Sequence, residues 1–240
     1  MKYIYIIGVF LLFSCSNNKD KLTAQQIVDK SIEVSGLDKI NKTSLSFKFR
    51  DKNYNAVRNN GVFKLNRTFD SIKDEITNTG FKRFINDKQI ELSDSLSTVY
   101  TNSVNSIHYF SVLPYGLNDK AVHKKLLPSV SIKGKDYYKV EITFSKNGGG
   151  EDFEDVFIYW INKQTFLVEY LAYSYKTDGG GKRFRDIINE QNIKGIRFVN
   201  YNNYKPKSKE IPLINLDKAF EENQLTKVSE IILEDIQVKL

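Results

Sequence analysis

Two histidines, His108 and His123, are the only candidates for imidazole chemistry in the sequence. His108 precedes the aromatic pair Tyr109 and Phe110 in an apolar helical pattern, where a hydrogen-bonded structural role is commoner than a role as general base. The chain has no His-x-x-x-His pair, no Gly-x-Ser-x-Gly elbow and no GxxxxGK[ST] phosphate loop. The sequence therefore predicts no catalytic residue, no metal site and no cofactor, and a hydrolase that uses His108 with an acidic partner stays open as an alternative.

Aromatic residues are abundant, with 16 phenylalanines and 14 tyrosines. They can fill a core, or they can line a pocket for an acyl chain, a sterol or a glycan. We favour a cavity, because both faces of the predicted sheet carry apolar side chains. The candidate ligand-binding residues are aromatic or neighbour aromatic residues: His108, Tyr109, Tyr115, Tyr159, Trp160, Tyr170 and Tyr173.

Two glycine-rich turns each precede a charged run. Gly148–Gly150 precedes the acidic residues 151–155, and Gly179–Gly181 precedes the basic residues 182–185. The two runs form either a cation site or polar rim at a cavity mouth, or complementary surface charge on neighbouring strands. Carboxylates that alternate along a strand cannot all face one ion, which favours surface charge over a cation site. The candidate rim residues are Asp155, Arg183 and Arg185.

The single cysteine, Cys15, lies where an apolar run ends and a polar run begins. Lys2, the apolar run Tyr3–Phe13 and Ser14 follow the order of a secretory signal, and the run is shorter than the about 20 residues that span a bilayer. Leu12–Cys15 also resembles the lipobox of bacterial lipoproteins. This resemblance implies cleavage before Cys15, a diacylglycerol thioether on its sulfur and an acylated amino terminus, which together anchor a protein stably.

The chain is basic, with a net charge of +7 and a pI near 9.2. In a cytosolic protein this charge would indicate a nucleic-acid partner, but the export signal excludes one. The lysines are spread along the chain, so the charge serves either attraction to anionic lipid or lipopolysaccharide, or solubility.

Two helices are expected from apolar periodicity. The first covers Ala24–Ser35, where Thr23 and Gln26 have the spacing of a capping box and a glycine follows the last turn. The second covers Asp94–Val112, where apolar residues recur at three- and four-residue steps until Pro114.

The rest of the chain alternates like β-strands, with turns such as Asn59–Gly61 between them. The expected strands are Leu45–Arg50, Tyr54–Arg58, Val62–Phe69, Phe81–Asn86, Gln89–Leu92, Ser129–Ile132, Tyr137–Ser145, Phe153–Ile161, Phe166–Tyr175, Phe184–Asn192, Ile196–Tyr204 and Val228–Val238. There is no βαβ alternation. We therefore expect an α+β fold that is mainly antiparallel β: a curved half-barrel sheet with an N-terminal helix and a second helix packed in or on the concave face.

A register can be predicted for the central strands. With a turn at Asn162–Gln164, Asp155 faces Ala172 and Ala172 faces Arg185, so that the charged pair meets across the small alanine. The same register places Phe157, Tyr159, Tyr170, Val168 and Ile187 on that face. It places Trp160, Leu171, Tyr173, Phe184 and Ile188 on the other.

A family resemblance is carried by four segments: GGGEDFEDVFIYWIN, EYLAYSYKTDGGGKRFRD, GIRFVNYNNYKP and NSIHYFSVLPYGLND. They resemble an uncharacterised family of lipoproteins from Bacteroidota-type bacteria, over essentially the whole mature chain. The layout is similar to that of the periplasmic lipoprotein carriers of the LolA/LolB type. Those carriers hold acyl chains in the concavity of a half-barrel, so the resemblance implies the same use here.

The sequence thus predicts three segments: a lipoprotein signal peptide at 1–14, a lipidated tether at 15–22 and a single half-open β-barrel domain at 23–240. We expect an envelope lipoprotein, anchored through Cys15 to the outer membrane, whose soluble domain binds a hydrophobic or amphipathic ligand without catalysis. The alternatives are an interaction subunit of an outer-membrane assembly, with a membrane-protein partner, and the hydrolase.

Overall fold

The computed structural model describes residues 21–150, 152–176 and 179–240. Its helices are α1 (Ala24–Val34), α2 (Asp94–Ser111) and α3 (Leu216–Glu221), with 3-10 turns η1 (Leu37–Lys42), η2 (Tyr115–Asn118) and η4 (Leu213–Asn215). None of the helices among these residues is long and apolar enough to cross a membrane.

All strand pairs are antiparallel, and they form two seven-stranded sheets. Sheet A has the order β14-β1-β2-β3-β4-β5-β6, with bounds Glu234–Lys239, Ser44–Phe49, Lys52–Asn59, Val62–Phe69, Ile72–Thr77, Gly80–Ile85 and Lys88–Ile90. Sheet B has the order β13-β12-β11-β10-β9-β8-β7, with bounds Leu225–Ile231, Ile196–Pro206, Gly181–Ile193, Val168–Tyr175, Val156–Asn162, Lys135–Phe144 and Val122–Ile132. Neither sheet closes on itself, which confirms the predicted fold class.

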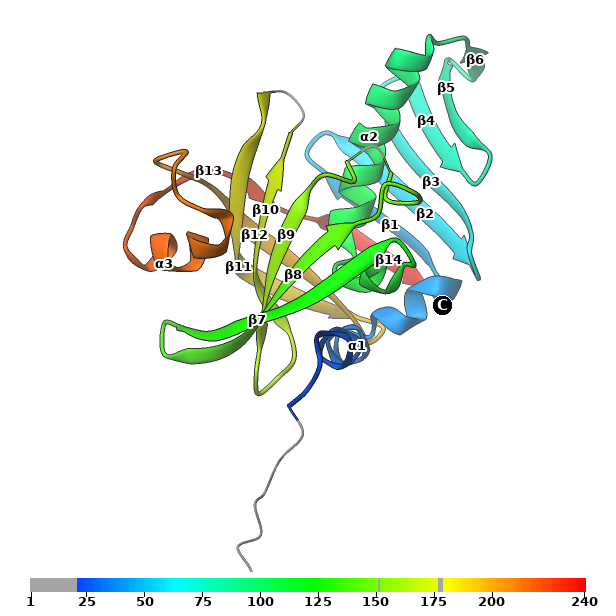
Figure 1. Cartoon of the computed structure of the whole chain (residues 1–240). Coiled ribbons are helices and arrows are strands. Elements are labelled where there is room, and N and C mark those ends of the chain that lie inside the picture. The colour runs from blue at the N-terminus through cyan, green and yellow to red at the C-terminus, as the bar shows by residue number, and fades with distance from the viewer. Residues whose placement is uncertain (1–20, 151, 177–178) are drawn as a thin grey trace, which may run out of the picture.

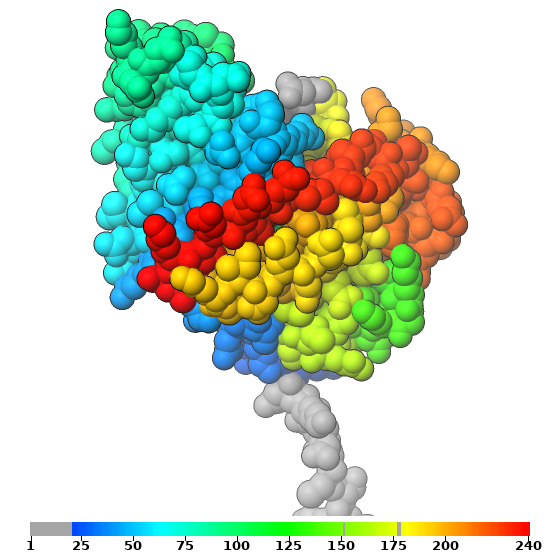
Figure 2. Space-filling view, turned by 180° about the vertical axis from the view of Figure 1, so that it is seen from behind, coloured from blue at the N-terminus to red at the C-terminus, as the bar shows by residue number. Residues whose placement is uncertain are grey.

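The C-terminal strands connect the two sheets. β13 pairs with β12 of sheet B, and β14, which begins three residues later, pairs with β1 of sheet A. Figure 2 shows this red segment running across the back of the molecule between the blue strands of sheet A and the gold strands of sheet B. The predicted single strand Val228–Val238 is therefore wrong, because the chain divides there and joins a different sheet on each side.

Helix α2 lies between the sheets and packs against β3, β4 and β5 (Figure 1). The main core gathers α1, α2, sheet A and one face of sheet B, which we call the inner face; it includes Val140, Phe157 and Leu171. A second core covers the opposite, outer face of sheet B, where α3 packs over Trp160 and Phe184. Both faces of sheet B are thus covered by the chain itself.

Several elements agree closely with the sequence analysis. The α1 capping box of Thr23 and Gln26 is present, and α2 begins at the predicted residue and ends one residue early. Strand β3 has the predicted bounds, and its Asn60–Gly61 turn pairs Asn59 with Val62. Strand β4 and helix α3 were not predicted.

The predicted register of β10 is wrong by three residues against β9 and by one residue against β11. Leu171 pairs with both Tyr159 and Arg185, whereas Ala172 pairs with Ile158 and Phe184. Leu171 and Tyr173 therefore lie on the inner face, and Tyr170 lies on the outer face with Trp160. The change of face arises at an irregularity between Val168 and Tyr170, just after the turn.

The β9–β10 turn is longer than predicted. The Asn162 carboxamide oxygen accepts hydrogen bonds from the backbone N–H groups of Gln164 and Thr165 at 2.9 and 3.2 Å. Phe166 adopts a positive φ of 58°, and the ladder is irregular between Val168 and Tyr170. Val168 still lies on the predicted inner face, and the irregularity after it turns Tyr170 and the following residues to the opposite faces.

Candidate binding site

Beneath α2, sheet A carries a buried ionic triad of Arg67, Asp74 and Arg83, from the adjacent strands β3, β4 and β5. The Asp74 carboxylate is fully buried. It accepts hydrogen bonds from Arg67 Nε and Nη2 at 3.0 and 2.6 Å, and from Arg83 Nε and Nη2 at 2.6 and 2.9 Å. All of its acceptor sites therefore face guanidinium groups.

The triad also holds α2 in place. Arg67 Nη1 donates to Ser103 Oγ at 2.7 Å, and the Arg83 guanidinium carbon lies 3.4 Å from the centroid of the Tyr100 ring. Both contacts join sheet A to the same helix, so α2 is attached to sheet A by charged groups.

His108 is part of this attachment and is 1% exposed. Its Nε2 lies 3.0 Å from the backbone oxygen of Asn66, and its ring packs edge-on against Phe47 and Tyr54. Burial lowers the pKa of His108 to about 3, so the imidazole is neutral. The partner is a backbone carbonyl rather than a carboxylate, and solvent does not reach the ring; this geometry gives no support to a hydrolase based on His108.

Helix α2 meets the inner face of sheet B through aromatic rings. The Phe110 ring lies 5.3 Å from that of Tyr173 and 6.1 Å from that of Phe157, and Tyr109 lies 6.1 Å from Phe157, between centroids. Tyr159 stacks beside Phe157. The Tyr109 hydroxyl of α2 and the Tyr159 hydroxyl of sheet B lie close enough for each to act on the pKa of the other.

The hydroxyl groups of Tyr109 and Tyr159 are buried and have no hydrogen-bond partner of ordinary geometry. Burial raises the pKa of Tyr109 to about 12, and burial followed by the neighbouring Tyr109 raises that of Tyr159 well above its usual value. Both hydroxyl groups therefore remain neutral potential donors. They lie at the contact between α2 and sheet B.

The predicted rim residues do not meet as a pair. Arg185 is buried on the inner face, and its Nη2 donates to the Tyr173 hydroxyl at 3.2 Å. Asp155 lies before β9, and partial burial together with Asp152 and Glu154 raises its pKa to about 6. The predicted contact between Asp155 and Arg185 across Ala172 is wrong, because the shifted register of β10 puts Leu171 beside Arg185.

The charged side chains of the two glycine-rich turns lie largely at the surface. Glu154 pairs with Lys176 at 2.5 Å, and both side chains are at least half exposed. Arg183 is half-buried, with its guanidinium carbon 5.2 Å from the Tyr175 ring centroid. No cluster of acidic, histidine or cysteine side chains suited to a metal ion occurs within the described ranges.

Three predicted ligand-binding residues lie away from α2's contact with sheet B. Trp160 and Tyr170 belong to the outer-face core, where the Trp160 indole N–H donates to Asp217 at 3.1 Å. Tyr115 donates from its hydroxyl to Asn41 at 2.5 Å, at the end of the fold near η1. Cys15 lies outside the described residues.

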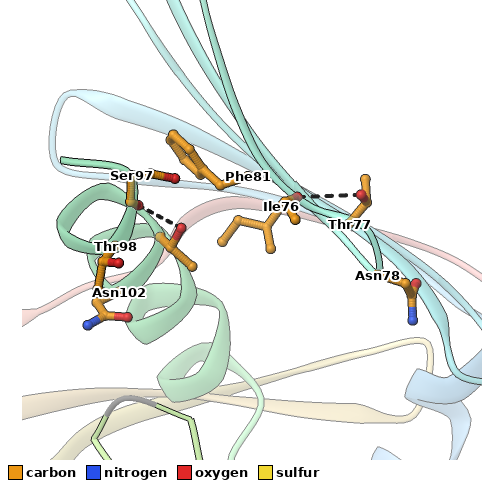
Figure 3. A pocket seen from close by; sticks show the side chains of 9 residues that line it. Ile76, Thr77, Asn78, Phe81, Ser97, Thr98 and Asn102 are labelled. Carbon is orange, nitrogen blue, oxygen red and sulfur yellow. Dashed lines mark hydrogen bonds between the residues drawn. The ribbon is translucent and has the colours of Figure 1, made fainter. Parts of the chain in front are cut away.

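The described pockets are open ones at the edges of the fold. One, of about 350 Å³, lies between the N-terminal half of α2 and the β4–β5 hairpin. Figure 3 shows Ile76 and Phe81 of the hairpin facing Ser97 of the helix. Leu96 and Val99, on the same half of α2, are 45% and 57% exposed. This half of the helix therefore packs loosely.

The sequence analysis missed the triad, although the pattern contained a signal for it. Arg67, Asp74 and Arg83 each sit between apolar residues at i−2 and i+2, in positions that alternation assigns to the buried face. A charge at such a position requires a buried partner. Because strand β4 was not predicted, that argument was not applied to Asp74.

The chain belongs to the DUF6503 family, a family of unknown function, whose sequence profile matches residues 2–234. The match agrees with the expected membership of an uncharacterised family. No curated protein matches the chain at a significant level.

Two solved structures have similar folds. A LolA superfamily protein from Nitrosomonas europaea is 15% identical, with a TM-score of 0.50 over 92% of this chain and 95% of that one. A DUF1329 family protein from Desulfovibrio piger is 12% identical, with a TM-score of 0.50 over 91% of this chain and 94% of that one. At these identities the comparisons establish the fold, and they confirm the expected LolA-like architecture.

Proposed function

We propose that this DUF6503 protein binds the apolar chain of a hydrophobic or amphipathic ligand between α2 and sheet B, without catalysing a reaction. The observation that supports this proposal is the unequal attachment of α2. On sheet A the helix is held by a hydrogen bond from Arg67 and by the His108 contact with Asn66. On sheet B it contacts a layer of rings and, through Phe110, the guanidinium of Arg185.

A contact made mainly of rings can open with little loss of hydrogen bonding, whereas separation from sheet A would break the hydrogen bond of Arg67 to Ser103 and the contact of His108 with Asn66. Opening along sheet B would expose an apolar aromatic groove, which includes Phe157 and Tyr173. Such a surface suits an acyl chain, because apolar burial is non-directional and scales with the area covered. The filled core of the present structure is then the ligand-free, closed form.

The signal anatomy around Cys15 supports membrane anchoring of the same domain. We infer that acyl chains on Cys15 hold it at the cell envelope, at the outer membrane, where lipidic ligands are at hand. The exposed large apolar side chains of the described residues are spread over several elements, with no more than two on any one of them, and this spread does not favour the alternative as an interaction subunit. They are Val34, Val57, Val62, Leu96, Val99, Leu126, Ile188, Ile214, Val228 and Leu240.

A fluorescent fatty acid, whose emission changes when it leaves water, tests the proposal directly. Titration of the protein should give saturable uptake, and an unlabelled fatty acid should displace the probe. A folded protein that takes up neither the probe nor the competitor would contradict the proposed function.

A further inference from the structure

Arg185 is a buried cation without a counter-ion in the described chain. Its side chain is 5% exposed. Nη2 donates to the Tyr173 hydroxyl at 3.2 Å, while Nε and Nη1 have no hydrogen-bond partner. Within residues 21–150, 152–176 and 179–240, no carboxylate forms an ion pair with this guanidinium.

The other buried cations all have carboxylate partners. These pairs are Arg67 and Arg83 with Asp74, Lys139 with Asp217, and Arg197 with Glu190. Among the fully buried cations of the described residues, Arg185 is thus the one without a counter-ion; the half-buried Arg58 also keeps an Nη1 without a partner.

Ring contacts do not replace the missing partner. The guanidinium carbon lies 4.1 Å from the Phe110 centroid and 5.3 Å from the Tyr173 centroid, distances typical of cation–π attraction. A ring face does not supply the in-plane acceptors that guanidinium N–H groups require, and arginine does not release its proton in proteins. Two donors thus remain unpaired in a site that excludes water, which is strongly unfavourable.

The polar groups around Arg185 are unpaired as well. Asn203, opposite Arg185 on β12, keeps its Oδ1 without a partner, so the guanidinium is not directed toward it. The hydroxyl groups of Tyr109 and Tyr159 have no partner of ordinary geometry other than each other, and Tyr159 lies close enough to Arg185 for the positive charge to act on its pKa. Donors from α2 and from sheet B therefore gather at one place.

This cluster lies near the surface. Phe110 and Tyr173, the rings that cover the guanidinium, are themselves partly exposed. A single layer of rings separates Arg185 from solvent, and Phe110 belongs to the last turn of α2. Movement of that turn away from sheet B would uncover the charge.

We propose that Arg185 binds the anionic head group, a carboxylate or a phosphate, of an amphipathic ligand whose chain lies between α2 and sheet B. The inference rests on the proposed function and adds the charge of the ligand and the position of its head. The oxyanion replaces the Phe110 ring beside the guanidinium and accepts hydrogen bonds from Nε and Nη1. The hydroxyl groups of Tyr109 and Tyr159 supply further donors.

Calorimetric titration with matched ligands tests this assignment: dodecanoate, the neutral 1-dodecanol with the same chain, and acetate as a head group alone. The wild-type protein should prefer dodecanoate to dodecanol by at least about tenfold, as expected for a charged hydrogen bond. Arg185→Gln should lose that preference and still bind dodecanol. Arg183→Gln removes the same charge two residues away on the same strand face, and should keep the wild-type preference.

Equal wild-type affinities for dodecanoate and dodecanol would overturn the head-group assignment while leaving the proposed function intact. Binding of neither ligand would contradict the proposed function itself. If acetate binds as tightly as dodecanoate, the site binds a free small anion, and the assignment of an amphipathic ligand is overturned. If Arg185→Gln does not fold, Arg185→Met removes the charge and keeps an unbranched apolar side chain, and an unchanged preference in that variant would also overturn the assignment.

Discussion

The guanidinium of Arg185 lies 4.1 Å from the centre of the Phe110 ring, which joins sheet B to the last turn of α2 through a cation and an aromatic face. On sheet A the matching contact is that of the Arg83 guanidinium with the Tyr100 ring, but there Arg67 also donates a hydrogen bond to Ser103 of the helix, and His108 Nε2 lies 3.0 Å from the backbone oxygen of Asn66. The difference makes the two sides of α2 unequal, and the first prediction depends on it.

Phe110→Ala should speed the uptake of a fluorescent fatty acid, because it removes a ring that closes α2 onto sheet B. Phe220→Ala is the matched control, since Phe220 is also half-buried in an aromatic cluster but on the outer face, 5.0 Å from Phe184. Each variant should lose about 2 kcal/mol of stability. Stopped-flow fluorescence compares the uptake rates. Faster uptake by Phe220→Ala alone would place the ligand on the outer face instead.

Asp74→Asn should destabilise the protein by about 3 kcal/mol, because it leaves two buried guanidinium groups without a counter-charge. Urea unfolding measures the change in the free energy of unfolding. Glu230→Gln, which removes an exposed carboxylate paired with Lys227, should cost less than about 1 kcal/mol. Equal costs for the two variants would show that the triad contributes no more than a surface ion pair.

The neutral, buried His108 should make the free energy of unfolding fall as the pH is lowered. Its pKa is about 3 in the folded protein and near 6.5 when exposed, so the unfolded state binds the proton first as the pH falls. The stability that neutral His108 contributes is complete above its pKa in the unfolded state. It is lost as the pH falls toward its pKa in the folded protein. From about pH 7 to about pH 5, the wild type should lose about 2 kcal/mol more than His108→Gln.

Urea unfolding at the two pH values checks this difference. Asp155, whose pKa is raised to about 6, acts in the opposite direction but is present in both proteins, so the comparison removes its effect. The exposed His123→Gln variant controls for the loss of a histidine. Identical pH profiles for the wild type and His108→Gln would contradict the buried, neutral state.

Gly36→Ala should destabilise the protein strongly, because Gly36 has a φ of 65° and a Cβ there would lie 1.7 Å from the backbone oxygen of Gly195. Gly61 also has a positive φ, but a Cβ at that turn would meet nothing within 4 Å. Thermal unfolding should therefore show that Gly36→Ala lowers the free energy of unfolding by at least about 2 kcal/mol more than Gly61→Ala does. Gly61→Ala adds only the backbone strain of alanine at a positive φ. Similar costs would mean that α1 can move away from the β11–β12 hairpin.

Local signals in the sequence predicted much of the fold. The α1 capping box, the periodicity of α2 and the Asn60–Gly61 turn each involve residues close in sequence, so their geometry is readable without tertiary contacts. The same local reasoning missed β4, whose charged residues Lys73, Asp74 and Glu75 interrupt the apolar pattern of a strand.

The candidate site was harder to predict, because it depends on register and on packing between distant elements. An irregularity between Val168 and Tyr170 decides which face Leu171 and Tyr173 occupy, and no local sequence signal marks it. Arg185 was correctly placed on the face of Tyr159, but nothing local indicates that Phe110 would cover it. Burial of a charge without a partner is visible only once α2 and sheet B are brought together.

Native mass spectrometry of the exported protein tests the central claim most directly. The Cys15→Ser variant cannot carry the covalent lipid. When it is produced in the organism from which the protein comes, any added mass belongs to a molecule that the domain binds. The account predicts an added mass that dissociates as a molecule with an acyl chain. Protein of the bare chain mass, from a preparation that also takes up no fluorescent fatty acid, would contradict it.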